Sequence, residues 1–282
     1  MNKIRFVTDW IIPPRLFGLV RNSYCDLVHM LSYKKHQIAS RNAIFHNKYH
    51  GKRCFVIGNG PSLKQNDLLQ LNGELTIVMN YFCENPVLGS WQPTLYCAGD
   101  PLSSYHVHEL EAMKNVPKKI LPTEGYFFPL SVRNLFVKNT IFPEEKTFYL
   151  DMCKSFDDWD GRKELSLTGA VPGVQNTAIM GIILAIYMGC KKIYLLGLDH
   201  NWLAYKKISL TPHFYKGLPR DRLDPTNSWK YVQNIQAVFI MFSQYEKIHE
   251  HARRNGIEII NLTEGSYLDE FPTAKLEDIL KG

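Results

Sequence analysis

Short apolar runs alternate with longer amphipathic segments along the chain from Lys52 onward. Runs of three to five mostly apolar residues, rich in β-branched and aromatic types, are typical of buried strands in a parallel sheet. They predict strands at residues 54–57, 75–79, 94–97, 119–121, 147–150, 192–196 and 258–261. Helices are expected after Pro61 and at residues 106–115, 174–188 and 228–255. This alternation predicts an α/β fold with a mostly parallel, doubly wound sheet of Rossmann-like form.

Two segments depart from the alternation. Residues 1–50 are aromatic, basic and rich in His and Tyr, and we expect them to form a helical N-terminal extension packed on the core. The alternative is a contact with a membrane surface or a partner through Arg15, Arg21, Lys34 and Lys35. Residues 51–282 are expected to form the Rossmann-like nucleotide-binding domain. Within it, residues 202–227 are polar, aromatic and too long for an ordinary connection, so they predict a lid loop.

The composition excludes several classes of protein. The chain has 282 residues, 45% of them hydrophobic and 21% charged, so it can bury a core and is not expected to be disordered. Its net charge of +6 favours anionic ligands but does not by itself indicate nucleic acid. Six cysteines without CxxC spacing predict reduced core cysteines in a cytoplasmic protein. Neither a signal peptide nor an apolar run of the ~20 residues that a membrane span needs is expected.

The first predicted strand is followed by the sequence GNGPS, which has the chemistry of a ligand-binding turn. Gly58 and Gly60 would let the backbone approach a ligand closely, and Pro61 suits the first turn of a helix. The N–H groups of the loop, the helix dipole and the Ser62 hydroxyl could then bind a phosphate. Asn59 adds an amide that donates and accepts. A tight strand-to-helix turn without a ligand fits these residues equally well.

Polar residues also end three other predicted strands. Asn80 follows the second strand, Asp100 the third, and Asp199 with His200 the strand at 192–196. Each of them alone is typical of a turn or a helix cap. Because the carboxyl ends of parallel strands meet at one edge of a sheet, the four strand ends together favour a binding site.

These residues lie in motifs that resemble a known group of proteins. The motifs are GNGPSL at 58–63, MN at 79–80, GDP at 99–101 and AIYMGCKKIYLLGLDH at 185–200. They resemble the DUF115 group, which includes proteins similar to the archaeal 6-hydroxymethylpterin diphosphokinase (MptE-like) and the Maf flagellin-glycosylation proteins. The same skeleton is similar to the family GT42 bacterial sialyltransferases, which use CMP-sialic acid. The resemblance spans about residues 52–272 and is more specific for the superfamily than for one reaction.

The resemblance implies roles for residues of the nucleotide site. Asn59 and Gly60 match the loop that contacts the nucleotide phosphate and ribose. Asn80 matches the asparagine that binds the cytidine nucleotide. Asp100 stands where the sialyltransferases have asparagine, which puts the sugar contact in doubt.

A further match lies at the start of the helix expected at 174–188. Asn176 and Thr177 fall in a Thr-Ser-Gly stretch of the sialyltransferases, where Thr177 keeps a hydroxyl beside helix N–H groups that can bind phosphate or carboxylate. Val174 replaces the arginine that the sialyltransferases have just before this stretch, which weakens the case for sialic acid itself.

The resemblance also implies a general base and phosphate ligands in the lid. The sialyltransferases use a lid histidine to deprotonate the acceptor and lid tyrosines to bind the departing phosphate. Here His213 is the expected base, with Tyr205 and Tyr215 as the tyrosines. His200 is the competing base, although a structural role bonded to a neighbouring backbone group is at least as good an interpretation, and Asp100 is the next candidate.

The leading hypothesis is a glycosyltransferase-like enzyme that uses a CMP-nonulosonic acid type of donor in bacterial surface glycan or glycoprotein synthesis. Its partners would be that nucleotide sugar and a glycan or glycolipid acceptor, with no nucleic acid, no metal and no required cofactor. An Asp-x-Asp at 157–161 is interpreted as a solvated loop.

Two alternatives remain open. One is a diphosphokinase that transfers diphosphate from ATP to a pterin-like alcohol, with Mg²⁺ held by Asp100 and Asp199. The other is a non-catalytic binding protein with a relic pocket. The sequence also leaves open a homo-oligomer and a cytoplasmic location at the inner face of a membrane.

Overall fold

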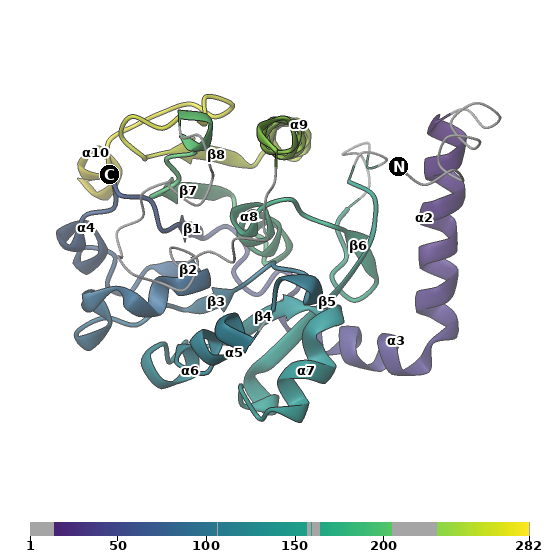
Figure 1. Ribbon diagram of the computed structural model, residues 1–282. Coiled ribbons are helices and arrows are strands. Elements are labelled where there is room, and N and C mark those ends of the chain that lie inside the picture. The colour runs from purple at the N-terminus through teal and green to yellow at the C-terminus, as the bar shows by residue number, and fades with distance from the viewer. Residues whose placement is uncertain (1–13, 106, 157–158, 160–163, 205–229, 282) are drawn as a thin grey trace.

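The protein is described from a computed structural model, in which residues 14–105, 107–156, 159, 164–204 and 230–281 are described. Its centre is an eight-stranded sheet in the order β6-β5-β4-β3-β2-β1-β7-β8, with helices on both faces (Figure 1). Every pair of neighbouring strands is parallel. The predicted α/β, doubly wound sheet is therefore confirmed.

The strands follow the predicted apolar runs closely. They are β1 (Arg53–Ile57), β2 (Leu75–Met79), β3 (Leu95–Cys97), β4 (Gly125–Pro129), β5 (Thr147–Lys154), β6 (Ala170–Pro172), β7 (Lys192–Leu196) and β8 (Glu258–Asn261). Six of the seven predicted strands are confirmed. The central strands β1 and β2 are buried almost throughout, as their continuous apolar sequences require.

Two strands were missed, and the strand predicted at 119–121 was wrong. Lys119 ends the short helix α6, in which Pro117 occupies the first turn, where its missing N–H is tolerated. The real strand, β4, starts at Gly125, where a Cβ would lie 2.6 Å from the carbonyl oxygen of Lys146, just before β5. Glycine and proline at the two ends of β4 conceal a strand whose five residues are all buried.

The described helices are mostly short. They are α2 (Pro14–Leu31), α3 (Tyr33–Ser40), α4 (Gln65–Leu69), α5 (Val107–Met113), α6 (Val116–Lys119), α7 (Arg133–Lys138), α8 (Thr177–Tyr187), α9 (Tyr231–Arg254) and α10 (Leu276–Lys281). The predicted N-terminal helical region corresponds to α2 and α3, which pack on β5. No helix among the described residues is long and apolar enough to cross a membrane.

Helix α8 is the central helix of one face of the sheet. Ten of its eleven residues are buried, and Gly181 brings it so close to β1 that a Cβ there would lie 2.9 Å from Val56 Cγ1. The Asn176 side chain caps its first turn by accepting a hydrogen bond from the Ala178 N–H at 2.6 Å. At the other end Gly189 takes a left-handed conformation, with φ of 83°. Tight packing and capping therefore fix the N-terminus of α8 at the carboxyl edge of the sheet.

Apolar side chains form one core on each face of the sheet. The core under α8 and α9 includes Val56, Ile77 and Ile193, and the opposite core includes Phe55, Val78 and Tyr194. Alternate residues of each strand thus point to opposite faces. This leaves the strand ends, rather than the faces, for polar chemistry.

Candidate functional site

The strand order reverses direction between β1 and β7. The chain runs from β1 outward through β2 to β6, then returns to place β7 on the other side of β1. Ile57 at the end of β1 is in register with Val78 of β2 and Leu196 of β7. The loops after these strands therefore lie side by side at a topological switch point, the usual ligand position in open α/β sheets.

The GNGPS loop after β1 uses its backbone N–H groups within the protein. Gly58 N–H donates to Leu196 O at 2.8 Å, and Gly60 N–H donates to Gly197 O at 2.9 Å. Ser62 N–H donates to Asp199 Oδ1 at 3.3 Å. The sequence led us to expect these groups to bind a phosphate, but the structure directs them to the loop after β7.

The helix after this loop also differs from the prediction. Residues 61 and 62 form a turn, and α4 begins only at Gln65 and has five residues. Pro61 is therefore not in the first turn of a helix. The expected helix dipole at the loop is absent, because a dipole acts within the first turn of its helix.

Packing against the loop after β7 explains the two glycines. A Cβ at Gly58 would collide with Gly197 O and Leu198 Cδ2. A Cβ at Gly60 would lie 2.6 Å from Asp199 Cγ, closer still to Asp199 Oδ2, and 2.8 Å from Gly197 O. The glycines let two loops touch, whether or not a ligand is bound.

Asp199 joins the same two loops through its side chain. Its Oδ2 accepts a hydrogen bond from Ser62 Oγ at 2.8 Å, in addition to the contact with the Ser62 N–H. Its backbone oxygen accepts from the Tyr267 N–H at 2.9 Å. Asp199 thus fixes the edge of the site, with Ser62 bonded to each of its carboxylate oxygens.

Asn59 and Asn80 lie on adjacent strand ends, and their amides are fixed by hydrogen bonds. Asn59 Nδ2 donates to Met79 O at 3.0 Å, while Asn59 Oδ1 is buried and meets no donor among the described residues. Thr177 Oγ1 donates to Asn80 Oδ1 at 3.1 Å and accepts from the Gly99 N–H at 3.1 Å. Asn59 and Asn80 therefore lie at one edge of the sheet, as their positions after strands predicted. Thr177 joins Asn80 to Gly99, the residue before Asp100.

The conformation of Asn80 supports a special role for this position. Its φ is 51°, in the left-handed region that asparagine tolerates better than most residues. Tyr96 Oη donates to its backbone oxygen at 2.8 Å. With Oδ1 occupied by Thr177, the Asn80 Nδ2 has no acceptor within the described part of the chain. Asn80 can therefore donate a hydrogen bond to a ligand.

A small pocket opens beside Asn80, on the side away from β7. Its interior has room for about one water molecule. It is lined by Asn80, Tyr81, Ala98, Asp100, Ser104, Tyr105, Glu109 and Met113. Asp100 was expected at the site from its place after a strand, whereas Tyr105 and Glu109 were not expected there. Their position just after the GDP motif, at the start of a predicted helix, was the available signal.

His200 is in a closed environment. It is 7% exposed, its Nε2 lies 2.8 Å from the Tyr245 hydroxyl, and its ring stacks on Trp202 at 4.6 Å between centroids. Burial lowers its pKa to about 3, because the charged form loses its hydration. A histidine with this pKa is a weak base at neutral pH, so the geometry suits a structural role better than proton abstraction.

The remaining predicted residues lie at the α8 N-terminus or outside the described residues. Asn176, besides capping α8, has its Nδ2 3.3 Å from Met241 Sδ of α9. The expected lid residues Tyr205, His213 and Tyr215 lie outside the described residues, so their roles stay predictions. Among the described residues, no three His, Cys, Asp or Glu side chains are grouped as a metal site would require.

Comparison with known proteins gives only distant similarity. No family model matches the chain, and no curated protein matches it. The sialyltransferase CstII from Campylobacter jejuni, solved with cytidine-5'-monophosphate, is 19% identical, with 78% of this chain and 84% of that chain covered and a TM-score of 0.42. Its complex with CMP-3FNeuAc is 18% identical, with 79% and 84% covered and a TM-score of 0.39.

A second kind of neighbour is the MAf glycosyltransferase from Magnetospirillum magneticum AMB-1. It is 12% identical, with a TM-score of 0.48, and the match covers 86% of this chain and 38% of that chain. This chain thus spans well under half the length of that enzyme. Similarity at these levels assigns no activity to this chain.

Proposed function

We propose that this protein is a glycosyltransferase-like enzyme that binds a nucleotide-activated sugar at the switch point. The observation that carries the proposal is the pair of amides at the ends of β1 and β2. Asn59 presents a buried acceptor, Oδ1, and Asn80 presents a donor, Nδ2, from neighbouring strands. A hydroxyl group both donates and accepts, so a ribose suits this pair. Asn59, Asn80 and Thr177 are also the residues implied by the resemblance to the cytidine-nucleotide enzymes.

The geometry favours a nucleoside monophosphate donor over ATP. The N–H groups of Gly58, Gly60 and Ser62 are already used, so the loop offers few backbone donors for a triphosphate. Asp199, which the diphosphokinase alternative needs as a Mg²⁺ ligand, is hydrogen-bonded to Ser62. Both observations favour the glycosyltransferase alternative, with a CMP-linked nonulosonic acid as the proposed donor class.

The proposed reaction is an inverting transfer to an acceptor hydroxyl. The acceptor oxygen forms a bond to the anomeric carbon while the bond from that carbon to the phosphate oxygen breaks. His213 takes the acceptor proton, and Tyr205 and Tyr215 donate hydrogen bonds to the departing CMP phosphate. Asp100, which stands where the sialyltransferases have asparagine, would lie near the donor sugar, and Val174, in place of an arginine, favours a relative of sialic acid over sialic acid itself. A glycan or glycolipid acceptor and a cytoplasmic location follow from the resemblance alone.

Calorimetric titration of the protein with CMP, UDP and ATP plus Mg²⁺ tests the proposal. We expect CMP to bind without metal and more tightly than the others. Asn80→Asp keeps the size and the left-handed conformation but replaces a donor with a charged acceptor, so it should weaken CMP binding about 10- to 100-fold.

Asn47→Asp is the matched control. Asn47 also has a positive φ, of 54°, but its backbone N–H bonds to Tyr187 at the far end of α8. Its substitution should leave CMP affinity unchanged. Preference for ATP with Mg²⁺ would instead indicate the diphosphokinase, and the absence of binding by any nucleotide would indicate the non-catalytic alternative.

A further inference from the structure

Helix α2 is oriented with its small and polar side toward the sheet. Gly18, Asn22, Cys25 and His29 follow the i, i+4, i+7, i+11 spacing of one helix face, and they are buried or half-buried. A helix on a protein surface normally turns its most apolar side toward the core. From residue 19 onward, most of the larger apolar side chains of α2 lie on the opposite side.

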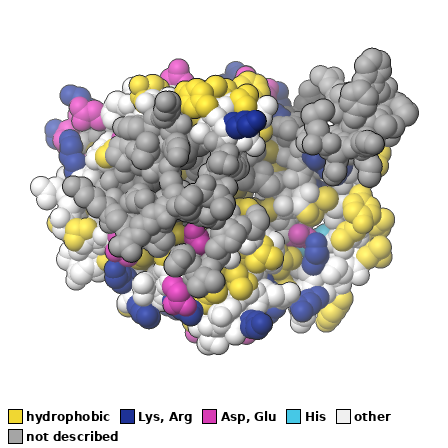
Figure 2. All heavy atoms as spheres, viewed as in Figure 1, with side chains coloured by type: hydrophobic (Ala, Val, Ile, Leu, Met, Phe, Trp, Pro, Cys, Tyr) yellow, Lys and Arg dark blue, Asp and Glu magenta, His cyan; other side chains and the backbone are white. Residues whose placement is uncertain are grey.

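The α2 outer face is a largely apolar surface, interrupted by Ser23. Its members are Leu19, Val20, Tyr24, Leu27, Met30 and Leu31, which are between 52% and 75% exposed. At 3.6 residues per turn they cover about 140° of the helix circumference. Helix α2 stands at the edge of the molecule (Figure 1), and hydrophobic side chains gather at the same edge of the surface (Figure 2). An extended, planar surface can therefore contact this face of α2.

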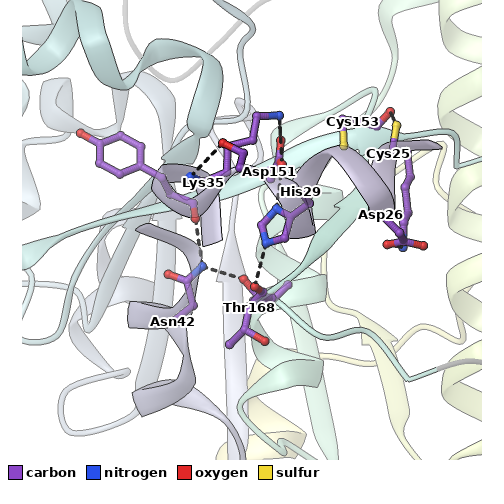
Figure 3. A network of polar contacts seen from close by, with 12 residues as sticks. Cys25, Asp26, His29, Lys35, Asn42, Asp151, Cys153 and Thr168 are labelled. Atoms are coloured by element: carbon purple, nitrogen blue, oxygen red, sulfur yellow. Dashed lines mark hydrogen bonds and ion pairs between the residues drawn. The ribbon is translucent and has the colours of Figure 1, made fainter. Parts of the chain in front are cut away.

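Buried polar contacts hold α2 in this orientation (Figure 3). His29 Nδ1 lies 2.9 Å from Asp151 Oδ2, and its Nε2 lies 3.2 Å from Thr168 O. Lys35 Nζ lies 3.2 Å from the same carboxylate, which is on β5 and 5% exposed. Turning the apolar side of α2 inward would leave the buried Asp151 charge without His29, which is strongly unfavourable. The outer face is therefore fixed outward.

Positive charge is concentrated in the same part of the chain. The first 50 residues contain eight Lys or Arg and two Asp or Glu, which equals the +6 of the whole chain. Of the two acids, Asp26 pairs with Lys154 at 2.6 Å. Arg21 lies next to the apolar arc on the helix, and Lys34 is exposed just beyond its C-terminal end. Basic side chains thus border the apolar surface.

We propose that the α2 outer face docks on an anionic phospholipid bilayer, with α2 lying in the headgroup plane. The leucines, Val20 and Met30 would enter the acyl boundary while Arg21 and Lys34 meet lipid phosphates. Tyr24 and Tyr33, which are 64% and 79% exposed, have the amphipathic rings that favour this interface. A second copy of the chain would bring the same basic groups against each other, so its electrostatics are less favourable than those of lipid.

Flotation of the full chain with vesicles tests the proposal. We expect binding to vesicles of phosphatidylcholine mixed with phosphatidylglycerol and little binding to phosphatidylcholine alone. Leu27→Gln with Leu31→Gln should weaken binding at least about ten-fold, and Lys34→Gln about five-fold. Leu121→Gln with Val137→Gln is the matched control, because it changes apolar residues that are 60% and 43% exposed elsewhere.

Circular dichroism and urea denaturation of each variant confirm that it is folded. Equal binding to both vesicle types, or equal binding by the outer-face variant and the control, would overturn the proposal. So would a dimer that is lost in the outer-face variant while neither vesicle binds. None of these outcomes depends on whether the protein transfers a sugar.

Discussion

Replacing Gly60 with alanine should break the link between the loops that follow β1 and β7. An added Cβ would lie 2.6 Å from Asp199 Cγ and closer to Asp199 Oδ2, whereas ordinary van der Waals contact begins at 3.4 Å. The carboxylate must therefore retreat by at least about 1 Å, which takes it beyond hydrogen-bond range of Ser62 N and Oγ, now at 3.3 Å and 2.8 Å.

The cost of this retreat can be worked from the two lost bonds. A hydrogen bond to a charged acceptor contributes about 1.5–3 kcal/mol, and both partners here are partly exposed, so we expect Gly60→Ala to lower the free energy of unfolding by about 2–4 kcal/mol. Urea denaturation measures this change. Gly89→Ala is the control, because a Cβ at Gly89 meets no atom within 4 Å.

A double-mutant cycle identifies Asp199 as the cause. In an Asp199→Ala background the carboxylate is absent, and only the 2.8 Å approach to Gly197 O remains, so Gly60→Ala should cost markedly less. The reasoning is refuted if Gly60→Ala costs no more than Gly89→Ala, or if its cost is the same with and without the Asp199 carboxylate.

Two further predictions concern the histidines. Burial lowers the pKa of His200 to about 3 from 6.5, so between these values the unfolded chain binds a proton that the folded chain does not. The stability contributed by neutral His200 is present above pH 6.5 and is lost as the pH falls. Between pH 6 and 5 the free energy of unfolding of the wild type, measured by urea denaturation, should fall by about 1 kcal/mol more than that of His200→Gln. Parallel pH profiles of the two unfolding free energies would contradict this. His213→Ala should lower turnover of the CMP-linked donor by about 10²–10⁴-fold with little change in CMP affinity. His249→Ala, on α9, is its control, and near-normal turnover of His213→Ala would move the base to Asp100.

The sequence by itself determined most of the sheet and the edge where the site lies. Continuous apolar runs such as those of β1, β2 and β7 can be buried only in a two-faced parallel sheet, so their alternation with helices predicted both strands and fold class. Polar residues at their ends had to meet at one edge for the same reason. Asn80 and Asp100 could accordingly be placed at one edge from the sequence, and the structure shows both lining one small pocket.

Only the tertiary structure decided what the loop and helix termini do. The GNGPS amides have partners at the end of β7 and in the loop after it, some 140 residues later in the chain, and no local pattern shows that β7 pairs with β1. His200 likewise has ordinary local sequence, and its closed environment comes from Tyr245 of α9. The outward apolar side of α2 depends on the buried Asp151 of β5. Local sequence preferences decide which helices and strands form. Contacts between distant parts of the chain, through backbone groups and buried charges, decide which surfaces of those helices and strands stay exposed.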